Sequence, residues 1–184
     1  DASLRLQSEH ALSVDNVARA VAKLPEDGAR IVNDRPMPDG NCQHIIAVAL
    51  VSGEVSFEDS HSYERMKDPA VLEAKSRVEL IADPALMDPA APRSGKVDVT
   101  LRDGRTFSHF TRHAPGTKEN PMDTEAVNAK ARSLMAPVLG AGQAEGLIGR
   151  VNALDDLGDV RELWHFLART GHKTTPPADA SPAA

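Results

Sequence analysis

The residues best suited to chemistry lie where a loop, residues 33–41, meets an apolar segment that starts at Cys42. If Asn41 caps a helix here, His44 falls in its first turn, where the helix dipole favours the neutral imidazole that can act as a base. The unpaired backbone N–H groups of that turn suit a carboxylate, and Arg35 can clamp the same group through two hydrogen bonds. The candidates in this segment are therefore one catalytic residue, His44, and three substrate-binding residues, Arg35, Asn41 and Gln43.

The same residues also allow a purely structural interpretation. Arg35 can pair at the surface with Asp34 or Asp39, and His44 can bond to a carbonyl of the loop. Residues 19–44 carry as many acidic as basic side chains, so the segment has no local excess of positive charge. The residue types alone leave both interpretations open.

Histidine pairs and glycine clusters elsewhere do not form a recognisable site. His109 and His113 have the spacing of metal ligands on a helix, but this region is predicted to be extended, and four residues of a strand span roughly 13 Å. The glycines of residues 140–146 follow a helix and have the wrong spacing for a dinucleotide-binding loop, so we interpret them as helix-ending residues. His61 has no evident partner and is interpreted as a surface residue. We therefore predict no metal and no cofactor.

Composition narrows the class of protein. The 184 residues include 41% hydrophobic and 26% charged residues, which is typical of a folded globular chain. A net charge of -6 and only 3% aromatic residues argue against nucleic acid as a partner. The single cysteine, Cys42, excludes an internal disulfide and fits a reducing, cytoplasmic setting. The longest apolar run, residues 45–51, is far shorter than the ~20 residues that cross a bilayer, so we expect no membrane partner.

The elements that must position the loop are predicted from local patterns. Residues 14–21 have apolar side chains at helical spacing, although their β-branched content leaves a strand open. Residues 42–52 fit a buried helix that stops at Gly53, with a buried strand as the alternative. Two short helices broken at Asp68 follow, because Asp68 can cap a helix that starts with a proline. Residues 78–82 are then a short strand, and residues 83–94 form a loop.

A hairpin and a group of helices are predicted for the rest of the chain. Residues 96–102 and 105–111 alternate around Asp103-Gly104, which predicts a hairpin with a two-residue turn. Asn120 is the predicted cap of a helix that carries an apolar face. Further helices are predicted at residues 144–151 and 160–168, and residues 172–184 are predicted to be disordered.

The loop and the segment after it resemble the signature of the smaller domain of the MmgE/PrpD family. This family includes 2-methylcitrate dehydratase, cis-aconitate decarboxylase and iminodisuccinate epimerase. Residues 37–53, MPDGNCQHIIAVALVSG, carry the resemblance, which extends over most of the chain from about Leu4 to Leu167. Its further motifs are SFED at 56–59, DPAVL at 68–72, the strand at 77–82, the hairpin, and GTKENP at 116–121.

The resemblance implies an α+β fold: a small antiparallel sheet with a β-hairpin packed against helices, plus C-terminal helices that belong to a larger helical domain. Residues 14–24 are expected to be a strand in such a domain, against the periodicity, and we follow the resemblance. The implied division is a helix at 1–12 continuing from a missing helical domain, the smaller domain at 13–118, C-terminal helices at 119–171 and the tail at 172–184.

The implied function is part of a lyase or isomerase that needs no cofactor. The family abstracts a proton next to a carboxylate of a small di- or tricarboxylic acid, and then loses water or carbon dioxide or returns the proton. The position of His44 is commonly a tyrosine in family members, and histidine keeps a proton-transfer group with a pKa nearer neutral. Most of the family's acid/base groups lie in the helical domain, so we expect this chain alone to be inactive.

Two further expectations follow from the resemblance and from the start of the chain at Asp1. We expect the chain to be a piece of a longer protein that forms a homodimer. The alternatives are a non-catalytic binding or assembly module with the same fold, and one half of a split enzyme.

Overall fold

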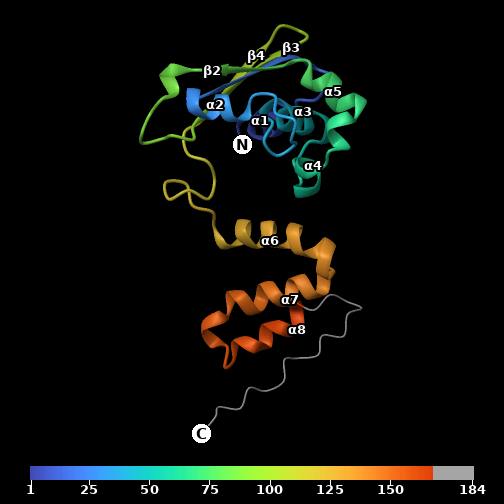
Figure 1. Ribbon diagram of the computed structural model, residues 1–184, viewed down its shortest axis with the longest axis vertical. Coiled ribbons are helices and arrows are strands. Elements are labelled where there is room, and N and C mark those ends of the chain that lie inside the picture. Colours follow the sequence, from blue (N-terminus) through green and yellow to red (C-terminus); the bar gives the residue numbers. More distant parts are fainter. Residues whose placement is uncertain (168–184) are drawn as a thin grey trace. The chain divides into compact units, whose positions relative to one another are not determined.

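The computed structural model describes residues 1–167, which fall into two compact units (Figure 1). The first unit is Asp1–Met122, and the second begins at Asp123. The predicted disordered tail, residues 172–184, lies outside the described residues.

A four-stranded sheet organises the first unit. Its spatial order is β2 (Val78–Ala82), β1 (Val17–Leu24), β3 (Gly95–Leu101) and β4 (Thr106–Thr111). β1 pairs antiparallel with β3 but parallel with β2, so the sheet is mixed rather than purely antiparallel. The parallel pair arises because residues 25–77 cross over between β1 and β2 with helices, whereas a tight turn would return the chain antiparallel.

β1 confirms the strand that the resemblance implied and corrects the periodicity. Val17, Ala20 and Ala22 are buried, and the shift from odd to even positions coincides with an irregular register between Val17 and Arg19. The strand is central, with neighbours on both edges. Pairing with partners far along the chain therefore decides the conformation that the local apolar spacing misassigns.

The hairpin exists, but its turn is one residue longer than predicted. The Leu101 N–H donates to the carbonyl of Arg105 at 2.8 Å, so three residues form the loop between this pair. The Gly104 N–H donates to the Leu101 carbonyl at 3.0 Å, and Gly104 has a φ of +88° while Asp103 does not have a positive φ. A two-residue turn of the predicted kind would need positive φ at both central residues, and aspartate pays a steric cost there that glycine does not.

Helices cover one side of the sheet in Figure 1. α1 (Ala2–His10) contacts β4 and β3, while α2 (Glu26–Val32) and α3 (Cys42–Ser52) contact β2. Beyond α3 come α4 (Phe57–His61), a 3₁₀ turn at Arg65–Lys67 and α5 (Pro69–Lys75). As predicted, Asp68 caps α5, with its carboxylate accepting from the Ala70 N–H at 2.9 Å.

α3 is the central helix of this unit because it is apolar almost all round. Ile46 and Leu50 pack with the sheet and α1, while Val48 on another side packs with Val71 of α5. Val48 and Val71 are fully buried, and each contributes on the order of 2 kcal/mol through burial of its side chain. A helix buried on both sides holds its first turn firmly in place.

The second unit contains α6 (Thr124–Leu139), α7 (Ala141–Asn152), short 3₁₀ turns and α8 (Trp164–Leu167). α6 is capped by Asp123, whose carboxylate accepts from the Ala126 N–H at 2.8 Å, three residues after the predicted cap. Both residue types suit the position, so local sequence did not distinguish them. Gly140, with a φ of +83°, ends α6 as predicted, whereas Gly142 and Gly146 lie inside α7 and do not end a helix.

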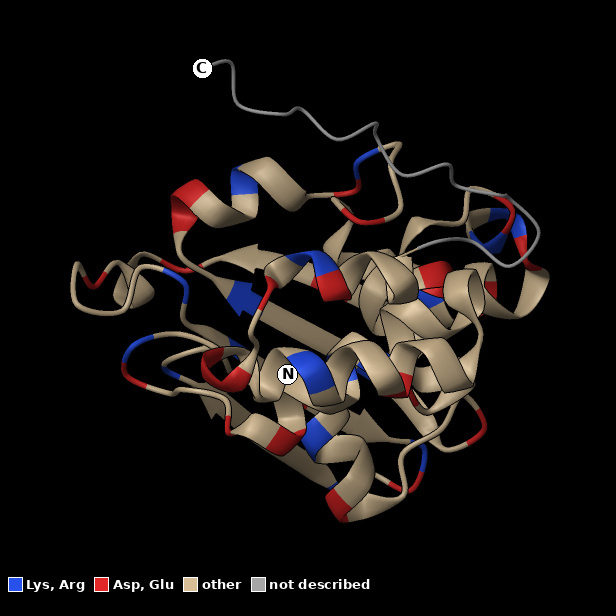
Figure 2. Cartoon of the chain, turned by 90° about the horizontal axis from the view of Figure 1, so that it is seen from below, with Lys and Arg blue, Asp and Glu red and all other residues tan. Residues whose placement is uncertain are grey.

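These elements confirm the α+β class, with a sheet packed against helices. No helix among residues 1–167 has the length and apolar character needed to span a membrane. Lysine and arginine alternate with aspartate and glutamate along the elements rather than gathering by sign (Figure 2).

Candidate functional site

The first turn of α3 is held by Asn41, which is 1% exposed. Its Oδ1 accepts from the His44 N–H at 2.9 Å, as the predicted helix cap requires. Its Nδ2 donates to the carbonyl of Arg35 at 2.7 Å and to the carboxylate of Asp34 at 3.2 Å. Asn41 therefore ties the preceding loop to the helix, and these three hydrogen bonds are made within the chain.

Gln43, two residues after Asn41, also bonds to this loop. Its Oε1 accepts from the Asp34 N–H at 3.0 Å, and its Nε2 donates to Oδ1 of Asn33 at 2.6 Å. The side chain is 8% exposed. Gln43 and Asn41 thus shape the loop, a role that their predicted substrate-binding function did not include.

Asp34 is the residue on which this network converges. Its φ of +44° is uncommon for a residue other than glycine, and its carboxylate pairs with Lys75 at the end of α5. Hydrogen bonds from Lys75 and then from Asn41 hold the pKa of this carboxyl below its usual value. Hydrogen bonds therefore fix the loop to the start of α3, and an ion pair fixes it to α5.

Arg35 is exposed, and its side chain has no hydrogen bond or ion pair with any residue in 1–167. The surface pairing that was the structural alternative is not formed, since Asp34 pairs with Lys75 and Asp39 lies 4.0 Å from His61. The network places the Arg35 backbone next to Asn41. No described interaction joins its guanidinium to His44.

His44 is 1% exposed, and its Nε2 has no hydrogen-bond partner among the described residues. Burial lowers the pKa of His44 below its ordinary value, and the positive charges of Lys75 and Arg65 lower it further. The main chain and carboxylate of Asp59 act in the opposite direction. The imidazole is therefore kept neutral at neutral pH, in the state that accepts a proton, and it faces the side of α3 that carries α4 and α5.

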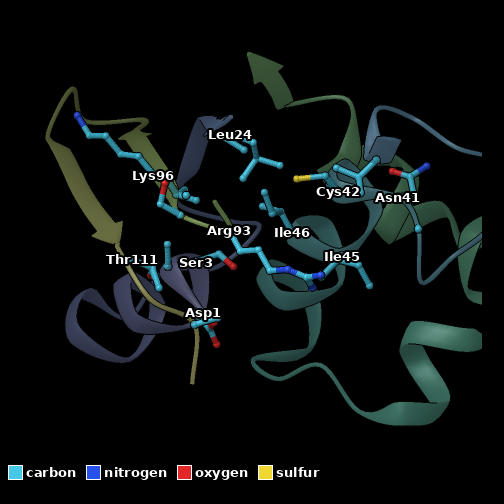
Figure 3. Close-up of a pocket in the computed structure, with 18 of the residues that line it drawn as sticks. Asp1, Ser3, Leu24, Asn41, Cys42, Ile45, Ile46, Arg93, Lys96 and Thr111 are labelled. Carbon is cyan, nitrogen blue, oxygen red and sulfur yellow. The ribbon is translucent and has the colours of Figure 1, made fainter. Parts of the chain in front are cut away.

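A cavity of about 310 Å³ lies along a different side of the α3 start. Figure 3 shows Cys42, Ile45 and Ile46 of α3 on one side of it and Lys96 and Thr111 of the hairpin on the other. His44 does not line this cavity. The structure thus separates the predicted catalytic residue from the hollow that begins two residues earlier on the same helix.

The cavity contains polar groups that the sequence did not single out. Arg93 and Ser94 come from the loop before β3, and Ser94 is 2% exposed with no partner for its hydroxyl in the described part of the chain. Burial raises the pKa of the Cys42 thiol to about 11, so the thiol is neutral. No sequence pattern links residue 93 to residue 42, because their proximity comes from sheet and helix packing.

The sequence interpreted His61 as a surface residue and placed His109 in a strand, and the structure confirms both. His61 on α4 is exposed and stacks on Phe57, with ring centroids 4.0 Å apart. His109 lies in β4, and with His113 it lines a shallow surface hollow next to Arg5 and Arg112. Within residues 1–167, no group of three histidine, cysteine, aspartate or glutamate side chains is arranged to hold a metal ion.

Comparison with known proteins shows the family of this chain. Residues 1–156 match the MmgE/PrpD C-terminal domain. Cis-aconitate decarboxylase of Mus musculus is 27% identical over 159 residues, and that of Homo sapiens is 29% identical over 162. These matches cover 83% and 85% of this chain but only 32% and 33% of the decarboxylases, so the chain spans about a third of their length. The chain belongs to the MmgE/PrpD C-terminal domain family.

Proposed function

We propose that this chain is the smaller-domain part of a lyase or isomerase that acts on a small di- or tricarboxylic acid. The reaction starts with abstraction of a proton next to a carboxylate and needs no cofactor. It ends in loss of water, loss of carbon dioxide or return of the proton. The domain works with a helical domain outside these residues, in a homodimer. The family membership and the two decarboxylase relatives support the reaction class.

The observation that carries the proposal is the state of His44. A neutral imidazole with an unpaired, buried Nε2 sits in the first turn of a helix whose start is fixed by Asn41 and Gln43. Buried polar atoms without partners are rare in folded proteins, and they recur at sites where a ligand completes the bonding. We assign the proton transfer to His44, and we assign Arg35 to a substrate carboxylate because its guanidinium is exposed and unpaired in residues 1–167.

The burial of His44 sets a condition on this role. Its ring lies under the segment that contains Asp59, which belongs to the five-residue helix α4. No side chain of α4 is buried, so this helix has little packing to hold it in place. Substrate reaches Nε2 when α4 is displaced.

The test uses the whole protein that contains this chain, assayed with small di- and tricarboxylic acids for dehydration, decarboxylation and solvent deuterium exchange. His44→Phe should lower kcat by about 10²- to 10⁴-fold, the usual contribution of a general acid or base. His44→Tyr should retain part of the activity with a pH optimum shifted upward, since a phenol has a pKa near 10.

The matched control is His109→Phe, which removes a histidine of β4 that has no role in the proposed reaction and should leave kcat unchanged. If His44→Phe turns over as fast as the unaltered protein, the assignment of proton transfer to His44 is wrong. If none of the acids is converted or exchanged by the whole protein, the lyase proposal itself fails, and the alternative of a binding or assembly module replaces it.

A further inference from the structure

We propose that the cavity beside Cys42 is a binding site for a carboxylate with an apolar body, anchored by Arg93 and Ser94. This site is separate from His44 and does not depend on the proposed reaction. Its volume of about 310 Å³ falls at the lower end of the range for small-molecule pockets.

Arg93 supplies the charge. Its guanidinium has no ion pair or hydrogen bond with residues 1–167, and Figure 3 shows its side chain extending across the cavity toward Ile45 of α3. The other basic side chain at the cavity, Lys96, is paired with Asp98 at 3.2 Å, and its amine points away from the hollow in Figure 3. Arg93 is therefore the side chain at this cavity that is available to an anion.

Two buried hydroxyls supply hydrogen bonds. Oγ of Ser94 and Oγ1 of Thr111 have no partner in the described part of the chain, although both residues line the cavity. A buried hydroxyl without a partner is unfavourable, so a ligand oxygen that completes either bond is stabilised by it. A carboxylate can accept from a hydroxyl and from a guanidinium at the same time.

The start of α3 adds a third element. Gly40, Asn41 and Cys42 line the cavity at the helix start, and the first N–H groups of a helix have no partner within it. The Asn41 side chain bonds to the His44 N–H and leaves the N–H groups of Cys42 and Gln43 uncapped. The helix dipole favours an anion at this end.

The rest of the lining selects against a small polyanion. Most of it is apolar, including Ala22 and Leu24 of β1, Ile46 of α3 and Val97 of β3. Two acidic residues, Asp1 and Asp39, also line the cavity and would disfavour a second negative group. A single carboxylate on an alkyl chain satisfies both features.

The experiment titrates the 184-residue chain with hexanoate and with hexanamide, its neutral analogue, by calorimetry at neutral pH. Hexanoate should bind at least about tenfold more tightly than hexanamide, because one charge-assisted pair is worth roughly that factor. Arg93→Gln should remove that preference, and Ser94→Ala should weaken hexanoate binding by about three- to tenfold. Bound hexanoate should also slow alkylation of Cys42 by iodoacetamide.

Two controls separate Arg93 from other positive charges. Arg102→Gln removes an exposed arginine at the hairpin turn and should leave hexanoate binding unchanged. Acetylating the α-amino group of Asp1, which also lines the cavity and whose pKa is lowered by burial, should have no effect.

The proposal is overturned if hexanoate does not bind, if hexanamide binds equally well, or if the acetylated chain loses binding while Arg93→Gln keeps it. Each of these outcomes leaves the assignment of His44 untouched, because that residue is outside the cavity.

Discussion

At the scale of single residues, the chemistry of this domain depends on how burial treats His44. The ring has almost no exposed surface and is flanked by Lys75 and Arg65, so its charged form is disfavoured. Asp59 offsets part of this through its main chain and carboxylate. The residue is thus held as a base rather than as an imidazolium, as the position at a helix start had predicted.

The lowered pKa of His44 predicts a pH dependence of stability. The unfolded chain takes up this proton near pH 6.5, before the folded chain does. The contribution of His44 to the free energy of unfolding should therefore be fully present above about pH 6.5. It should decrease as the pH drops below this value and level off below the pKa that His44 has in the folded chain. Urea unfolding of His44→Gln should lack this fall.

His61→Gln is the control, since His61 is exposed, and it should keep the pH dependence of the unaltered chain. Identical slopes for His44→Gln and the unaltered chain between pH 7 and pH 5 would contradict the prediction.

At the scale of elements, the start of α3 joins a loop, two helices and the sheet. Asn41 caps the helix and holds the backbone of Arg35, and Gln43 holds the backbone of Asp34. Both residues were predicted to bind substrate. The structure gives their polar atoms bonds within the chain, so we assign them the positioning of the loop that carries Arg35.

Replacing Asn41 should lower the free energy of unfolding more than replacing an ordinary helix cap does. Asn41→Ala removes the bond to the His44 N–H and leaves the Arg35 carbonyl without its donor, so it should lower the free energy of unfolding by about 2–3 kcal/mol. Ser56→Ala removes the cap of the exposed helix α4 and should cost about 1 kcal/mol or less. Equal losses in urea unfolding would show that the loop bonds contribute nothing beyond the cap.

At the scale of the whole molecule, the chain spans about a third of the length of its curated relatives. Its second unit exposes large apolar side chains that the sequence pattern assigned to packed faces. Val127 and Leu134 of α6 are 51% and 39% exposed, and Trp164 is 60% exposed. Exposed apolar side chains on neighbouring helices mark surfaces that a partner covers, and we propose the helical domain for this role.

Trp164 is the single tryptophan of the chain, so its fluorescence tests this covering directly. Acrylamide should quench the 184-residue chain strongly and should quench Trp164 less when the helical domain is joined to it. Phe166, which lies against Gly146 of α7, offers a second site: Phe166→Trp in a Trp164→Phe background should be quenched to the same degree in both forms. Equal quenching of Trp164 in both forms would exclude this surface as the contact.

The sequence by itself determined the elements whose signals are local. α3 with its cap Asn41 and stop Gly53, α5 with its cap Asp68, and the strand β2 lie where the residue types predicted them. Caps, prolines and positive-φ glycines act within a few residues, so no other part of the chain is needed to read them.

Only the tertiary structure decided the features that join distant residues. β1 is a strand because β2 and β3 bond to it from both edges, although its own apolar spacing favours a helix. Asn41 and Gln43 bond within the chain because the loop folds back onto them, and Arg93 and Ser94 reach the cavity beside Cys42 because β3 lies near α3. Hydrogen bonds and burial across long sequence separations set these positions, and no local pattern in the sequence records which partners will meet.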